Sequence, residues 1–245
     1  MQTQHIQIAD MSCNLFLPKD YHESVRSYPV IYVNGDVPIQ EIITEVNQAG
    51  YEADFILLSI QPGNWNDDFT PWSAPAFRKD EDAPAGLAGI YISRLTGAIK
   101  PYMDTNYRTK PEAENTALFG YSLGGLAAVY ALYKTDVFGM TGSLSGSLWY
   151  DGFCEFMEKN QPFRKDVKVY LSLGKKEKLS RNPRMSKVAE CTERARDILV
   201  GQLGVQNGQS GAQNVCLEWN EGGHFHDIPK RFAKAVVWWI SYEPA

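Results

Sequence analysis

The sequence predicts an α/β fold in which a mostly parallel central sheet carries helices on both faces and begins with an antiparallel hairpin. Short, apolar, β-branched runs alternate with longer segments whose apolar residues recur at helical spacing, which is typical of such sheets. No composition break or Gly/Ser-rich linker divides the 245 residues. A single domain over residues 1–245 is therefore expected, since α/β folds of this length form one core.

The N-terminal elements follow from local patterns. Residues 5–18 alternate apolar and polar side chains, which predicts two short antiparallel strands. Residues 29–36 form a β-branched run that ends in Asn34, Gly35 and Asp36, which favour a turn. This pattern indicates a buried strand. Residues 39–50 have helical spacing with a terminal glycine, and residues 54–60 predict a second buried strand.

The stretch 61–85 is a long irregular segment with two tryptophans, several prolines and an acidic run. Compact domains seldom keep so long a loop without using it, so a lid or binding loop near the active site is expected. The alternative is a mobile excursion on the surface.

The rest of the chain continues the alternation. Four further segments show helical spacing of apolar residues, and they are residues 86–107, 123–135, 182–204 and 228–242. Four further segments predict strands, and they are residues 116–120, 139–147 (a short strand entering a serine-rich turn), 167–174 and 214–220.

Charge and composition narrow the class of partner. The net charge is −5 and no Lys/Arg-dense face is evident, which argues against nucleic acid or a membrane as a partner and favours a small molecule. The N-terminus has no basic segment followed by an apolar one, so a cytoplasmic location is expected. The four cysteines form no CxxC pair and indicate reduced thiols; they are Cys13, Cys154, Cys191 and Cys216.

The motif that carries chemistry is GYSLGG at residues 120–125. Gly120, Ser122 and Gly124 form GxSxG where a predicted strand meets a predicted helix. In a nucleophile elbow, these glycines let strand and helix approach closely, and the serine hydroxyl stands above the sheet. The N–H of Leu123, at the helix start, would then point at a developing oxyanion. The alternative is a glycine-rich turn with an idle serine.

Serine needs a general base and an orienting acid, which in this motif's chain order follow as acid and then histidine. His224 follows two glycines in the loop before the last predicted helix, which favours it as the base over its neighbour His226. The sequence HFH also suggests a pair of histidine ligands to a metal ion, but no third ligand lies at a useful spacing. Glu177, after the strand 167–174, is the candidate acid, although its lysine neighbours also fit a solvated charged turn.

Two further groups of residues could complete the site. A second oxyanion N–H is expected from the loop after the strand 29–36, from Gly35 or Asp36, although Gly35 could serve only the turn. Trp65, Trp72 and Trp149 are candidates for the wall of an acyl or aryl pocket, and each could equally pack in the core.

Taken together, YPVIYVNGD, the FTPW loop, FGYSLGG, SLSGSLWYDGF, YLSLGKKE and EGGHFHD resemble the esterase D-like family, which includes the siderophore (enterobactin-type) esterases. The resemblance runs from about residue 10 to 240. It implies an α/β-hydrolase fold and a cytoplasmic carboxylic-ester hydrolase with Ser122, His224 and Glu177 as nucleophile, base and acid. That family usually carries an arginine before the DxTP-like segment, where this chain has Asn64, Trp65 and Asn66. Anionic catecholate substrates would therefore find less positive charge here.

The predicted function is serine-dependent hydrolysis of a small-molecule carboxylic ester through an acyl-enzyme, with no metal or organic cofactor. Two alternatives remain open from the sequence. One is an acyltransferase that uses the same three residues with another acceptor, and the other is a non-catalytic ligand-binding protein of the same fold.

Overall fold

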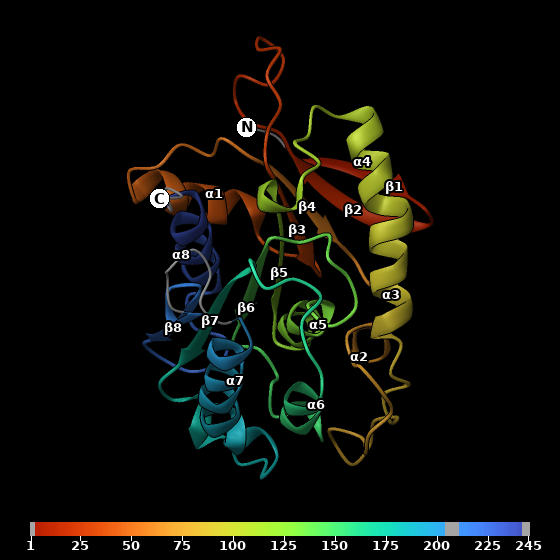
Figure 1. The fold of residues 1–245 in the computed structure, drawn as a ribbon, viewed down its shortest axis with the longest axis vertical. Helices are drawn as coiled ribbons and strands as arrows, with labels where there is room; N and C mark the ends of the chain where they lie inside the picture. The colour runs from red at the N-terminus through yellow and green to blue at the C-terminus, as the bar shows by residue number, and fades with distance from the viewer. Residues whose placement is uncertain (1–2, 204–210, 242–245) are drawn as a thin grey trace.

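The computed structural model describes residues 3–203 and 211–241, and its centre is one sheet of eight strands (Figure 1). The strands are β1 (Gln4–Ile8), β2 (Met11–Phe16), β3 (Val30–Asn34), β4 (Ile56–Ile60), β5 (Thr116–Tyr121), β6 (Met140–Leu144), β7 (Lys168–Gly174) and β8 (Val215–Asn220). Their order across the sheet is β1-β2-β4-β3-β5-β6-β7-β8. The pairs β1–β2 and β2–β4 are antiparallel and the others parallel, which confirms the predicted sheet with its N-terminal hairpin.

Helices cover both faces of this sheet (Figure 1). They are α1 (Ile39–Gln48), α2 (Trp65–Asp68), α3 (Ala88–Arg94), α4 (Lys100–Asn106), α5 (Leu123–Ala131), α6 (Phe153–Lys159), α7 (Val188–Leu203) and α8 (Ile228–Ile240). Side chains alternate along a strand, so Ile31 and Val33 of β3 pack under α1 and α8. Val30 and Tyr32 face the opposite layer, where α3 to α7 lie.

The structure differs from the predicted elements in three places. The helix α6 was not predicted, because its seven residues span too few turns for a clear period. The segment 86–107 is not one regular helix, since a π-turn at Leu95–Ile99 separates α3 from α4. Pro101 has no N–H to donate to the preceding turn, which accounts for the wider turn there. A short α2 also interrupts the long irregular stretch.

Two predicted helix ends, Gly204 and Tyr242, lie outside the described residues. Within the described part of the chain, α7 begins at Val188 and a 3-10 turn at Met185–Lys187 precedes it. None of the helices in that part is both long and apolar enough to cross a membrane.

The parallel strands bring the candidate residues to one edge of the sheet. β3, β5, β6, β7 and β8 run in the same direction, so the loops after their carboxyl ends gather on one side. Those loops carry Gly35, Ser122, Ser145, Glu177 and His224.

Candidate active site

Ser122 lies between β5 and α5 in a conformation that few non-glycine residues adopt. Its φ is 56° and its ψ is −121°, and such a conformation costs on the order of 1–3 kcal/mol. Backbone hydrogen bonds hold it in place. The Ser122 N–H donates to the Leu144 carbonyl at 3.1 Å, and its own carbonyl accepts from the Ser147 N–H at 2.9 Å. The turn therefore presents the hydroxyl at the N-terminus of α5, at the carboxyl edge of the sheet.

The glycines around Ser122 allow close backbone contacts that a side chain would prevent. A Cβ atom on Gly120 would lie 2.1 Å from the Gly124 carbonyl oxygen. A Cβ atom on Gly124 would lie 2.8 Å from the Asn34 carbonyl oxygen. Both distances are shorter than van der Waals contact, so glycine at 120 lets β5 approach α5 and glycine at 124 lets α5 approach the end of β3.

His224 lies in the loop between β8 and α8 and reaches Ser122. Its Nε2 is 3.1 Å from Ser122 Oγ, and its Nδ1 is 2.8 Å from Glu177 Oε2. Gly222 turns the loop with a φ of 81°, and the Tyr121 hydroxyl donates to the His224 carbonyl. These contacts orient the imidazole between the hydroxyl and the carboxylate.

The second histidine of the loop points elsewhere. His226 is exposed, and its Nε2 lies 3.1 Å from Asp227 Oδ2. The structure thus brings His224, and not His226, to Ser122.

Glu177 follows β7 in a short 3-10 turn and is buried, with its side chain only 3% exposed. Its Oε1 accepts hydrogen bonds from Ser145 Oγ at 2.7 Å, the Gly174 N–H at 2.7 Å and Arg231 Nη1 at 2.9 Å. Burial raises the pKa of this carboxyl, but the hydrogen bonds from His224, Ser145 and Gly174 outweigh burial and hold the pKa below its usual value. The carboxylate is therefore ionised where it meets the imidazole.

The N–H groups of Leu123 and Gly35 are both candidates for the oxyanion site, and only one of them is available. Leu123 is the first residue of α5, so its N–H has no partner within the helix and is available at the turn. Gly35 is not available, because its N–H donates to the Ile60 carbonyl at 2.8 Å as β3 continues its pairing with β4. The prediction of Gly35 as a donor is corrected on this ground, and Asp36 stays the candidate for the second N–H.

A pocket of about 390 Å³ opens over Ser122, and two of the three predicted tryptophans line it. Trp65 comes from α2 and Trp149 from the turn after β6. The ring of Trp65 lies so close to Gly35 that a Cβ atom there would be 2.6 Å from it. Other lining residues include Phe77, Arg78, Glu81, Met185, Val188 and Phe225. The long irregular stretch thus contributes part of the pocket wall.

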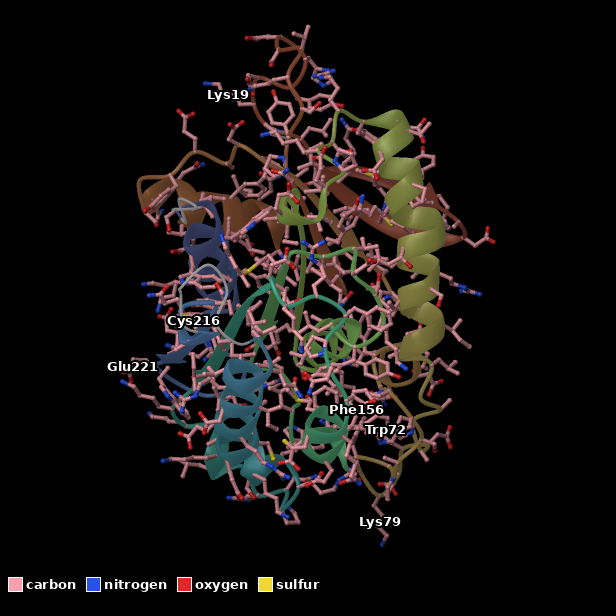
Figure 2. All side chains as sticks on the ribbon, in the orientation of Figure 1. Lys19, Trp72, Lys79, Phe156, Cys216 and Glu221 are labelled. Carbon is pink, nitrogen blue, oxygen red and sulfur yellow. The ribbon has the colours of Figure 1, made fainter. Side chains whose placement is uncertain are left out.

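Trp72 does not line this pocket, and its predicted role as a wall residue is corrected. Its Nε1 donates to the Asp151 carbonyl at 2.9 Å. Its ring packs among aromatic side chains of α5, of α6 and of the turn before α6, and they are Tyr130, Tyr150, Phe153 and Phe156. In Figure 2 the labelled Trp72 and Phe156 lie together, with ring centroids 5.4 Å apart. Trp72 therefore packs the 61–85 stretch onto the helical layer.

The structure also adds residues that sequence reasoning did not select. Ser147 Oγ lies 3.4 Å from Ser122 Oγ, and Ser145 adopts a φ of 48° while it contacts Glu177. Both serines follow β6, so the rule that carboxyl ends of parallel strands meet at one edge could have found them. Arg231 lies inside α8, and no local pattern in that helix marks it.

Comparison with known proteins decides the family. The family model Esterase, described as "Putative esterase", matches residues 7–215 of this chain. The chain belongs to this esterase family. A protein of Bacillus subtilis (strain 168) named YbbA is similar to this esterase, with 26% identity over 231 residues that cover 91% of this chain and 90% of YbbA.

Solved structures agree with this family membership at the level of the fold. An IroE-like serine hydrolase from Shewanella oneidensis matches this esterase with a TM-score of 0.77 and 18% identity, over 95% of this chain and 78% of that one. The enterobactin esterase FES from Shigella flexneri, in the presence of enterobactin, matches with a TM-score of 0.73 and 14% identity, over 98% of this chain and 59% of that one. The α/β-hydrolase fold is thereby confirmed, and the family membership supports ester hydrolysis.

Proposed function

We propose that this protein is a serine esterase that hydrolyses small-molecule carboxylic esters through an acyl-enzyme. The observation that carries the proposal is the hydrogen-bonded chain from Ser122 through His224 to the buried Glu177, at the floor of the pocket. This arrangement has the order and the spacing that an activated serine nucleophile requires.

In the first step, Ser122 Oγ attacks the ester carbonyl carbon while His224 Nε2 takes the hydroxyl proton. Glu177 accepts from Nδ1–H, which keeps Nε2 free to receive that proton. The N–H groups of Leu123 and Asp36 are the proposed donors to the oxyanion. When the tetrahedral intermediate collapses, His224 returns the proton to the leaving alcohol and an acyl-serine remains.

In the second step, water attacks the acyl-serine carbonyl. His224 takes one proton from this water and then returns it to Ser122 Oγ as the carboxylic acid leaves. The reaction consumes one ester and one water and restores the enzyme without any cofactor.

The pocket suggests which esters fit. Its walls include the aromatic side chains of Trp65, Phe77 and Trp149, which suit an aryl or short acyl group. Arg78 and Glu81 line the same pocket 3.5 Å apart, so their charges largely offset each other. We therefore expect neutral esters to be preferred over highly anionic ones, and an ester panel should include catecholate esters because a similar structure is named an enterobactin esterase.

The decisive experiment compares wild type, Ser122→Ala and Ser93→Ala in hydrolysis of p-nitrophenyl acetate and butyrate and in labelling by a fluorophosphonate. Ser93 is exposed on α3 and serves as the matched control. Removal of the nucleophile should lower kcat by about 10⁴–10⁶-fold and abolish labelling, whereas the control should match wild type. Labelling that persists in Ser122→Ala contradicts the proposal.

The same assay separates the alternatives. A binding protein would turn over none of the esters. An acyltransferase would transfer the acyl group to an added alcohol in preference to water, which product analysis would detect.

A further inference from the structure

The guanidinium of Arg231 lies beneath the candidate active site. Arg231 belongs to α8 and is 1% exposed. By volume it is the largest of the fully buried side chains among the described residues. An isolated charge so deep is strongly unfavourable, so a buried arginine requires an anion and hydrogen-bond acceptors around it. The anion is the Glu177 carboxylate, whose side chain is 3% exposed.

One edge of this guanidinium contacts the candidate acid and the residues around it. Nη1 donates to Glu177 Oε1 at 2.9 Å and to the Tyr121 hydroxyl at 3.2 Å, and it also contacts Ser145 Oγ. Glu177 Oε1 faces Arg231, while its Oε2 meets His224 Nδ1 at 2.8 Å. The cation thus lies behind the carboxylate, on the side opposite the imidazole.

The other edge holds the backbone of the loop that carries the histidine. Nη2 donates to the Gly223 carbonyl at 2.8 Å and to the Glu221 carbonyl at 3.3 Å. Gly223 directly precedes His224 in the chain. A single rigid guanidinium therefore connects the acid after β7 to the histidine loop after β8.

We propose that Arg231 is a positioning residue of the esterase site, which fixes the His224 loop against Glu177. The inference rests on the serine-esterase function proposed above. Arg231 does not line the pocket, so it acts through Glu177 and the loop backbone and not on the substrate.

Two substitutions test this positioning role. Arg231→Lys keeps the positive charge, but one ammonium lacks the planar fork that reaches the carboxylate and the two carbonyls together. Arg231→Met keeps much of the volume and removes both the charge and the hydrogen bonds. Lys100→Met is the matched control, since Lys100 is a buried cation that pairs with Asp104 in another part of the molecule.

The experiment measures kcat and KM for p-nitrophenyl acetate at neutral pH, with circular dichroism and urea unfolding as checks of the fold. In Arg231→Met, kcat should fall on the order of 10²-fold from loss of positioning, with KM little changed. Arg231→Lys should also lose kcat with KM little changed, because one ammonium cannot hold the carboxylate and both carbonyls, and Lys100→Met should lose stability with kcat and KM unchanged.

Each outcome bears on a defined part of the inference. A folded Arg231→Met with the wild-type kcat overturns it. If that variant does not fold, Arg231→Lys carries the test, because wild-type kcat in a folded Arg231→Lys shows that positioning by the fork is not needed. Failure of the proposed function is distinguishable, because then either wild type would hydrolyse no ester or Ser122→Ala would retain the wild-type activity, whatever the Arg231 variants do.

Discussion

At the scale of single residues, Glu177 shows how a carboxylate can be kept ionised below the surface. Its two oxygens receive hydrogen bonds from four groups, and one of those groups is a buried cation. Each donor compensates part of the hydration that the carboxylate loses on burial. The side chain can therefore accept from His224 Nδ1–H and set the tautomer that the proposed mechanism needs.

Glu177→Gln should lower kcat by about 10²–10⁴-fold with a smaller change in KM, because an amide can present its NH₂ to Nδ1 and favour the wrong imidazole tautomer. The measurement is steady-state hydrolysis of p-nitrophenyl acetate. Glu221→Gln is the matched control, since Glu221 lies in the His224 loop but is exposed and pairs with Lys175. Equal activities in the two variants would contradict the role of Glu177.

At the scale of elements, the contact between β5 and α5 depends on positions without side chains. The backbone of Gly120 faces the backbone of Gly124, and backbone atoms cannot move aside as a flexible side chain can. By contrast, beyond its chain neighbours and the backbone of its own helix, Gly97 in the π-turn has no heavy atom within 4 Å of the place where a Cβ would stand. Substitution of Gly120, with Gly97 as the matched control, therefore tests the elbow.

Gly120→Ala should destabilise the protein by roughly 1–3 kcal/mol through overpacking and should also remove esterase activity, because the Ser122 turn would shift. Gly97→Ala should be neutral or stabilise by about 0.5–1 kcal/mol, with activity unchanged. Urea unfolding at pH 7 and p-nitrophenyl acetate turnover measure the two effects. A Gly120→Ala variant with wild-type stability would show that the strand and helix have room to separate.

At the scale of the whole molecule, two apolar layers on opposite faces of the sheet enclose the buried strands, and the polar network of the candidate site lies at one edge of the sheet. That network links segments that follow β5, β6, β7 and β8 to α8. Its protonation state should therefore affect the free energy of global unfolding. Glu177 is the group through which this linkage acts.

Because the pKa of Glu177 in the folded protein lies below its ordinary value of 4.5, the folded state binds fewer protons there than the unfolded chain. Its stabilisation is complete above about pH 4.5 and is lost as the pH falls through the folded-state pKa. Wild type should exceed Glu177→Gln in unfolding free energy by about 3–5 kcal/mol at pH 7, and the gap should narrow below pH 4.5.

Urea unfolding at a series of pH values from 7 to 3 checks this expectation. Glu155→Gln is the control, because Glu155 also pairs with an arginine but its side chain is 52% exposed. Solvent screens such a pair, so its contribution should stay within about 1 kcal/mol at every pH. A wild-type advantage over Glu177→Gln that is independent of pH would exclude Glu177 as the linked group.

Much of the fold could be predicted from the sequence, because strand and helix periods are local. The eight strands and the longer helices fall where alternation and helical spacing place them, whereas the seven-residue α6 gave too short a pattern. GxSxG predicts the turn at Ser122 for the same reason, because its glycines are required where residues close together in the chain come into contact. The chain order of acid and histidine then pointed to Glu177 and His224, whose catalytic roles stay predictions.

Other features depend on which segments meet in space. Trp72 and Trp149 look alike in the sequence, yet one packs on α6 and the other lines the pocket, because burial is decided by neighbours distant in the chain. The Gly35 N–H is taken by Ile60 only because β3 pairs with β4. Arg231 lies within α8, where the spacing of apolar residues predicts the buried apolar face but not a buried arginine. The local geometry of the nucleophile turn was thus determined by the sequence itself, whereas the partners of each buried polar group were decided by the tertiary structure, since hydrogen bonds between distant segments leave no periodic pattern.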